Sequence, residues 1–142
     1  MKTTARNQFL GKVAELKQGA VNDEVTLALP GGQHIVAIVT QGSSASLGLV
    51  PGAEAFALIK ASSIILVADS AGARFSARNQ LAGLVTRVQT GAVNTEVVLD
   101  LPRGGTIAAI ITNQSSTDLG IAIGSSVTAI FKASSVILGV PA

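Results

Sequence analysis

The sequence contains no cysteine, and it is poor in histidine, aromatic residues and charge. Without cysteine the chain forms neither a disulfide nor a thiolate metal site, and it has no cysteine nucleophile. The single histidine, His34, does not by itself supply a histidine metal site. Aromatic residues make up 3% of the chain, with no tryptophan or tyrosine. A net charge of +2 is too small to predict nucleic-acid binding on electrostatics alone.

Long hydrophobic runs are also missing, although 48% of the residues are hydrophobic. Runs such as residues 64–68 have the length of a strand, whereas a spanning helix needs about 18 apolar residues or more. The N-terminus lacks the apolar segment of a signal peptide, so we expect a cytoplasmic protein with no membrane partner. The charged fraction of 13% is about half of the usual value. Because obligate oligomers bury large apolar interfaces, this low charge indicates a tight homo-oligomer.

The chain is a tandem repeat with an offset of 72 residues. Motifs that begin at Thr4, Gly19 and Lys60 return at Ser76, Gly91 and Lys132. No gap is needed, and about half of the paired positions are identical. The repeat predicts two domains, residues 1–70 and 71–142, joined by a short polar segment with Gly72 for a turn.

Each repeat has the alternating pattern of half-buried strands. In the first repeat we expect strands over residues 24–29, 34–39, 53–60 and 63–67, with a turn at 30–32. A short helix is expected over residues 43–48 and again over 115–120, with Ser43 as N-cap and Gly48 at the end. This pattern predicts an all-β chain of two tandem five-stranded barrels of the oligonucleotide/oligosaccharide-binding type. Oligomerisation would compensate for the marginal core of such small units.

The polar residues that both repeats keep are mostly hydrogen-bond donors, and two of them are cations. The kept pairs include Arg6/Arg78, Asn7/Asn79, Asn22/Asn94, Thr40/Thr112, Ser43/Ser115, Lys60/Lys132 and Ser62/Ser134. The acids mostly change, with Glu24/Glu96 as the exception. An oxyanion offers only acceptors, so these donors suit it, and the start of the short helix would add free N–H groups. No repeated histidine, aspartate or cysteine supplies a base, so the pattern predicts an anion receptor and not an enzyme.

Simpler interpretations stay open for several of these residues. Residues 19–22 fit a tight turn in which Asn22 adopts the left-handed conformation. Arg6 fits a surface ion pair, and Lys60 fits a solvated strand end. His34 becomes Thr106 in the second repeat, which is typical of a surface strand residue. None of the four phenylalanines recurs at the equivalent position of the other repeat, so we expect them in core or interface packing.

Four motifs follow one another in each repeat: Ser/Thr-Ala-Arg-Asn-Gln, Gly-Ala-Val-Asn, Thr-x-x-Ser before a short helix, and Lys-Ala-Ser. This series resembles the Mop domain of the molbindins over almost the whole chain, twice. It is most similar to the two-domain molbindins, which store or buffer molybdate. The resemblance implies a five-stranded barrel in each repeat and a trimer of two-domain chains. It also implies molybdate or tungstate sites at the contacts between barrels, with no other cofactor.

The resemblance further implies the residues of these sites. One barrel would supply Thr4 and Arg6, and its neighbour Thr40, Ser43, Lys60, Ala61 and Ser62. The second copy of the site would use Ser76, Arg78, Thr112, Ser115, Lys132, Ala133 and Ser134, and Asn7 and Asn79 belong to the same sets. Thr4 stands where the family usually has serine. Candidate axial sites near the threefold axis would use Gly19, Ala20, Val21 and Asn22, and Gly91, Ala92, Val93 and Asn94, mainly through backbone N–H groups.

The function implied is reversible sequestration of molybdate or tungstate, for molybdenum storage and homeostasis. A regulatory or delivery module acting on a protein partner is an alternative, because related Mop domains occur fused to DNA-binding domains or transporter ATPases. The sequence shows no helix-turn-helix pattern and no phosphate-binding loop. A single-stranded nucleic-acid-binding barrel is a further alternative, and the scarcity of stacking aromatics speaks against it. We therefore expect a homo-oligomer without a nucleic-acid partner.

Overall fold

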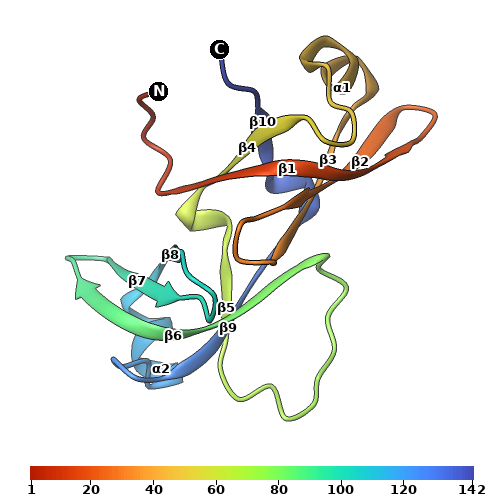
Figure 1. Ribbon diagram of the computed structural model, residues 1–142. Coiled ribbons are helices and arrows are strands. Elements are labelled where there is room, and N and C mark those ends of the chain that lie inside the picture. The colour runs from red at the N-terminus through yellow and green to blue at the C-terminus, as the bar shows by residue number, and fades with distance from the viewer. The chain divides into compact units, whose positions relative to one another are not determined.

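A computed structural model describes all 142 residues, which form two compact units, each built on a five-stranded sheet (Figure 1). Unit 1 comprises Met1–Ile59 and Lys132–Ala142, and unit 2 comprises Lys60–Phe131. The strands are β1 (Asn7–Gln18), β2 (Asn22–Ala28), β3 (His34–Thr40), β4 (Glu54–Ile59), β5 (Ile65–Val67), β6 (Asn79–Thr90), β7 (Asn94–Asp100), β8 (Thr106–Thr112), β9 (Ser126–Phe131) and β10 (Ile137–Gly139). The helices are α1 (Gln41–Leu47) and α2 (Asn113–Leu119), and η1 (Ala61–Ser63) and η2 (Ala133–Ser135) are short 3₁₀ turns.

The two sheets have the same topology. Their strand orders are β10-β4-β1-β2-β3 in unit 1 and β5-β9-β6-β7-β8 in unit 2, with every pair antiparallel. In unit 1 the two edge strands β10 and β3 contact each other, and in unit 2 β5 contacts β8, so each sheet curls towards closure. The expected fold class, an all-β chain of two five-stranded domains with one short helix each, is confirmed.

In the hairpin of β2 and β3, buried and less buried residues alternate along both strands, which is why the sequence pattern predicted these strands. Val25 and Leu27 on β2 and Ile35 and Ala37 on β3 are buried, and Val25 pairs with Ala37 while Leu27 pairs with Ile35. The chain reverses at Gly32, whose φ of 89° is in the region that favours glycine. His34 is exposed at the first position of β3, as expected for a surface strand residue.

The longest strand of unit 1, β1, was not located by the pattern. Its register with β2 shifts between Val13 and Glu15, so the side-chain alternation changes phase in the middle of the strand. The same shift occurs between Val85 and Arg87 in β6. A β-bulge of this kind breaks the period of two on which sequence recognition of a strand depends.

The compact units do not coincide with the repeats. Each repeat ends in a short strand that joins the sheet of the other repeat: β10 pairs with β4 in unit 1, and β5 pairs with β9 in unit 2 (Figure 1). The expected division into residues 1–70 and 71–142 therefore follows the sequence repeat, while the packed units exchange their last segments. The polar join between the repeats contains a turn, in which the Ala73 N–H donates to the Ser70 carbonyl at 2.9 Å. No helix has the length and apolar character that crossing a membrane requires.

Candidate oxyanion-binding site

Two hydroxyl groups meet where β3 ends and α1 begins. Thr40 is the N-cap of α1, and its Oγ1 accepts the Ser43 N–H at 3.1 Å and donates to Ser43 Oγ at 2.8 Å. Thr112 and Ser115 repeat this arrangement at α2, with distances of 3.1 Å and 2.9 Å. All four residues are exposed. Each unit therefore presents a paired Thr–Ser hydroxyl cluster at the same point of its fold.

The helix starts differ from the sequence prediction in two respects. The N-cap is Thr40 and not Ser43, because α1 begins two residues earlier than expected. Free N–H groups at Ser43 were also expected, and this was wrong, because the Thr40 side chain accepts that N–H. The Gln41 N–H donates to the Val21 carbonyl at 3.0 Å. Gly48 ends the helix with a φ of 66°, as predicted.

The Gly-Ala-Val-Asn segments lie next to these helix starts. Asn22 pairs with Thr40 in the β2–β3 ladder, and Asn94 pairs with Thr112 in the β7–β8 ladder. Residues 19–22 thus connect β1 to β2 as a hairpin loop beside the Thr40–Ser43 cluster. The loop needs no left-handed asparagine, since Asn22 is not among the residues with positive φ. Gly19 is required for space instead, because a Cβ there would collide with the Asn22 carbonyl oxygen.

In the arginine motif, Ser/Thr-Ala-Arg-Asn-Gln, the side chains of Asn7 and Gln8 hold the segment that carries the exposed Arg6. Asn7 is 2% exposed, and its Nδ2 donates to the Ile59 carbonyl at 3.2 Å where β1 meets β4. Gln8 Nε2 donates to the Ala5 carbonyl at 3.2 Å. These bonds fix the segment on either side of the exposed Arg6, so Asn7 has a positioning role. Gln8 was missed as a candidate, although its presence in both copies of the motif was a signal.

The second repeat holds its arginine in the same way. Asn79 is 1% exposed, and Gln80 Nε2 donates to the Ala77 carbonyl at 3.0 Å and the Phe75 carbonyl at 3.2 Å. Arg78 and Ser76 are exposed, as are Arg6 and Thr4 in the first repeat. The hydroxyl and the guanidinium of each motif are therefore presented on the surface, next to a buried asparagine.

The Lys-Ala-Ser segments are divided between the units in an unexpected way. One barrel was expected to supply Thr40 and Ser43 together with Lys60, Ala61 and Ser62. In the structure Lys60 and η1 belong to unit 2, where η1 contacts β8, and Lys132 and η2 belong to unit 1, where η2 contacts β3. The exchange of the last strands causes this regrouping. The lysine and the first serine of both segments are exposed, whereas Ala61 and Ala133 are each 4% exposed.

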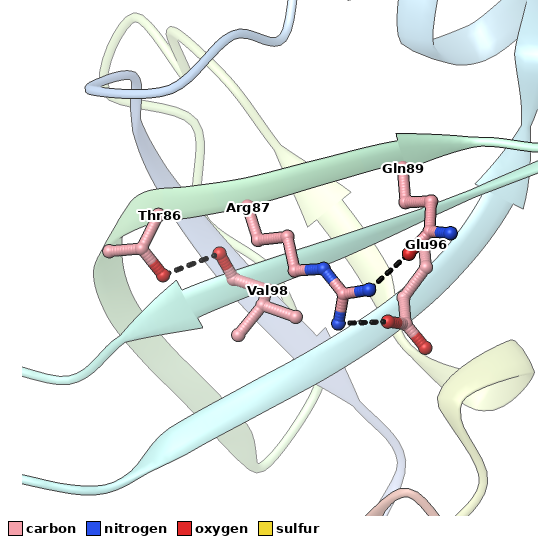
Figure 2. Close-up of polar contacts among 5 residues, drawn as sticks. All are labelled: Thr86, Arg87, Gln89, Glu96 and Val98. Carbon is pink, nitrogen blue, oxygen red and sulfur yellow. Dashed lines mark hydrogen bonds and ion pairs between the residues drawn. The ribbon is translucent and has the colours of Figure 1, made fainter.

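The acid that both repeats keep has a structural partner in unit 2. Arg87 forms an ion pair with Glu96 across β6 and β7, at 3.5 Å, and also donates to the side chain of Gln89 (Figure 2). The Glu96 side chain is 14% exposed, so the pair is partly shielded from water. Arg87 is thus a cation that serves its own sheet, and it lies outside the repeated motifs.

The site residues therefore form a set of donors without a clustered base. No group of three or more histidine, cysteine, aspartate or glutamate residues is placed to hold a metal ion. Exposed Arg and Lys side chains supply charge, and the paired hydroxyls supply directed hydrogen bonds. Such a set is suited to an anion with several acceptor oxygens.

Comparison with known proteins agrees with this assignment of the fold. The TOBE domain model matches residues 3–66 and 76–138, once in each repeat. The chain belongs to the TOBE domain family, as a tandem pair of the Mop type. The solved structure of the cytoplasmic molybdate-binding protein ModG, with molybdate bound, is 49% identical to it with a TM-score of 0.96. That match covers 99% of this chain and 100% of the ModG chain.

Curated relatives include a molybdenum-pterin-binding protein and regulators. The molybdenum-pterin-binding protein MopA of Rhodobacter capsulatus is 47% identical over 141 residues, which is 99% of this chain and 53% of MopA. The molybdenum transport protein ModE of Herbaspirillum seropedicae is 46% identical over 140 residues, 99% of this chain and 52% of that protein. The DNA-binding transcriptional dual regulator ModE of Escherichia coli K12 is 35% identical over 139 residues, 97% of this chain and 52% of ModE. The chain thus spans about half the length of these relatives.

Proposed function

We propose that this protein binds molybdate or tungstate reversibly and serves molybdenum storage and homeostasis in the cytoplasm. The observation that carries the proposal is the Thr–Ser hydroxyl cluster, which occurs at Thr40–Ser43 and again at Thr112–Ser115 with nearly the same distances. Two repeats that differ at about half of their positions keep this cluster and the exposed cations. The likeness to ModG over the full chain supports molybdate as the oxyanion.

The proposed main sites combine these clusters with the exposed cations. The residues are Thr4, Arg6, Thr40, Ser43, Lys60, Ala61, Ser62, Ser76, Arg78, Thr112, Ser115, Lys132, Ala133 and Ser134, with Asn7 and Asn79 as buried supports. Molybdate is a dianion, so burying it without compensation would be costly. Arginine and lysine offset its charge, while hydroxyls orient its oxygens. Sulfate has the same acceptor chemistry, so discrimination would rest on the size of the cavity.

These sites would be completed where copies of the chain meet. We propose a homo-oligomer, namely a trimer, in which one barrel supplies the arginine motif and another supplies the Thr–Ser hydroxyl cluster. The loops 19–22 and 91–94 are the proposed axial sites. Because ligand that binds only the assembled state stabilises it, oxyanion binding and assembly would be linked.

Native mass spectrometry tests this function directly. The protein would be titrated with molybdate in the presence of excess sulfate. Uptake of several molybdates by a trimer, with sulfate failing to compete, is the expected result. A monomer, or an oligomer that ignores molybdate, would remove the function and leave the fold standing.

A regulatory role is the second candidate. It is favoured by the ModE relatives, since the chain matches about half of each of these longer proteins. In that role the oxyanion would change how the barrels contact a protein or DNA partner. A pull-down from cell extract with and without molybdate distinguishes the two: a partner retained only with the ligand supports regulation, and its absence supports storage.

A further inference from the structure

The two strands that the repeats exchange are nearly identical in sequence. Residues 60–66 and 132–138 differ only at Ile64, which is replaced by Val136. Both segments form the same 3₁₀ turn followed by a three-residue strand. The shared residues would pair equally well with β4 and with β9, so any side-chain preference between these two partners must come from positions where the segments differ.

The registers show where that position lies. In unit 1, β10 pairs Ile137 with Leu58, Leu138 with Ala57 and Gly139 with Phe56. In unit 2, β5 pairs Ile65 with Ile130, Leu66 with Ala129 and Val67 with Thr128. The first two pairs have equivalent side chains in both sheets, so exchanging the strands would leave them unchanged. Among the residues paired in these ladders, only the third pair, Phe56–Gly139 against Thr128–Val67, distinguishes the two strands.

With the Phe56 ring as it lies in the structure, the Phe56–Gly139 contact leaves no room for a side chain on β10. A Cβ added to Gly139 would lie 2.6 Å from Phe56 Cζ and closer still to another atom of the ring. Gly139 is not among the glycines with positive φ, so the backbone itself accepts other residues there. The obstacle to a side chain at this position is therefore the ring of Phe56 and not the backbone. In the other sheet the small side chain of Thr128 faces Val67.

We infer that the pair Phe56–Gly139 selects the exchanged arrangement of the two repeats. With exchange, Phe56 faces a glycine, Gly139, and Val67 faces Thr128, a side chain of similar size. Without exchange, Phe56 would face Val67 and be overpacked, while Thr128 would face Gly139 and leave a gap. Overpacking and cavities are both destabilising, so both of the unexchanged pairs are worse than the exchanged ones.

This selection also positions the candidate binding residues. It carries Lys132 and η2 into unit 1, against β3, and Lys60 and η1 into unit 2, against β8. Phe56 and Gly139 lie on the strands and not among the proposed ligand residues, so their role is positioning. The inference does not depend on the identity of the ligand.

Engineered cysteines report the arrangement, because the chain has no cysteine of its own. In the exchanged form Leu58 pairs directly with Ile137, so the variant Leu58→Cys with Ile137→Cys can form a disulfide there. In the unexchanged form Leu58 would pair with Ile65, so the variant Leu58→Cys with Ile65→Cys reports that form. Paired residues on antiparallel strands have Cα separations that a disulfide spans. After oxidation and peptide mapping without ligand, we expect the 58–137 disulfide and no 58–65 disulfide.

Swapping the two deciding residues should reverse this result. The variant Val67→Gly with Gly139→Val gives β5 the glycine that Phe56 requires, so the 58–65 disulfide should become the major product. Adding Phe56→Thr and Thr128→Phe also swaps the residues that face positions 139 and 67. The phenylalanine on β9 then faces the glycine on β5, so the 58–137 disulfide should return. The symmetrised variant Phe56→Thr with Gly139→Val, in which both arrangements contain only Thr–Val pairs, should give both disulfides.

Three outcomes would overturn the inference. The first is a 58–137 disulfide that persists as the major product in the folded Val67→Gly/Gly139→Val variant. The second is a 58–65 disulfide in the fourfold variant, which remains a test even where the twofold variant does not fold. The third is a disulfide-linked dimer from the 58–137 pair, which would mean that β10 is supplied by a second copy. None of these disulfide patterns depends on oxyanion binding. Failure of this inference and failure of the proposed function are therefore distinguishable.

Discussion

The hydroxyl of Thr95 donates a 2.6 Å hydrogen bond to Oδ1 of Asn113, and the first repeat has the carboxylate of Asp23 at the position of Thr95. Both residues are buried, with Asp23 2% and Thr95 0% exposed. Asn113 Nδ2 donates to the Gly91 carbonyl at 2.9 Å, whereas the Gly19 N–H donates to Asp23 at 3.3 Å. A neutral pair therefore supports loop 91–94, and a buried acid supports loop 19–22.

This difference predicts that the two proposed axial loops bind an oxyanion unequally. A carboxylate beside loop 19–22 repels a bound dianion, so Asp23→Asn should strengthen binding there by about 1–2 kcal/mol, roughly five- to thirtyfold. Isothermal titration calorimetry with molybdate should show a higher affinity for the weaker of the two axial classes of site, the one at loop 19–22. Asp23→Thr with Gln41→Asn, which recreates the Thr95–Asn113 pair, should have the same effect.

Thr95→Asp is the reciprocal control. It introduces the acid beside loop 91–94 and should weaken the tighter axial class by a similar factor. Unchanged affinities in Asp23→Asn and Thr95→Asp, with the main sites still occupied, would contradict the assignment of these loops to oxyanion binding.

Removal of Arg78 should weaken the main sites of one repeat. Arg78→Ala deletes an exposed guanidinium next to the buried Asn79, so the fold should remain intact. The lost charge-assisted hydrogen bond corresponds to about 1.5–3 kcal/mol of binding free energy. A molybdate titration should show this loss for one set of sites.

Arg87→Ala is the matched control for that experiment. Arg87 is engaged with Glu96 and Gln89 in its own sheet, as Figure 2 shows, so its removal should leave molybdate affinity unchanged. The expected effect is a loss of stability at or above the roughly 0.2–1 kcal/mol of an exposed ion pair, because the Glu96 side chain is only 14% exposed. Equal loss of affinity in both variants would mean that net charge, and not the arginine motif, governs binding.

The hydroxyl of Thr112 should serve both the fold and the ligand. Thr112→Val removes the N-cap of α2, which typically lowers the free energy of unfolding by about 1 kcal/mol. Ser115→Ala removes a hydroxyl that accepts from Thr112 but caps nothing, so it should weaken oxyanion binding with little change in stability. Urea denaturation and molybdate titration of both variants separate the two effects. Thr112→Ser keeps the hydroxyl and should resemble the unchanged protein in both measurements.

Sequence periodicity was sufficient for the β2–β3 hairpin, and it was insufficient for the bulged strand β1 and for the exchange. Val25, Leu27, Ile35 and Ala37 alternate with less buried residues, so the pairing of β2 with β3 follows from local pattern. The exchange of β5 and β10 is a choice between two nearly identical segments, and it depends on a contact between residues far apart in the sequence. No local pattern contains that information.

The candidate site was predicted in its chemistry and less well in its geometry. Thr40 and Ser43 are both good capping residues, so the sequence alone did not show which one caps α1. Asn7 was chosen as a donor because both repeats keep it, but its Nδ2 donates to a backbone carbonyl inside the sheet. Residues kept for binding and residues kept for support look alike until their burial is known.

Gly11 tests the close packing of β1 against β2. A Cβ at Gly11 would lie 2.5 Å from the Ala28 carbonyl oxygen, and a Cβ at Gly83 would lie 2.6 Å from that of Asp100 in the other unit. Because the obstacle is backbone, the strands must shift to accommodate a methyl group. Gly11→Ala and Gly83→Ala should therefore each lower the free energy of unfolding by about 1–3 kcal/mol, measured by urea denaturation.

Gly42 is the matched control, since it lies in α1 with nothing within 4 Å of an added Cβ. Gly42→Ala should raise stability by about 0.4–1 kcal/mol, because alanine restricts the unfolded chain and favours a helix. The second repeat has Gln114 at the equivalent position, which shows that a side chain fits there. If Gly11→Ala proved as stable as Gly42→Ala, the β1–β2 approach would be looser than the structure shows. The glycine kept at this position in both repeats would then need another explanation.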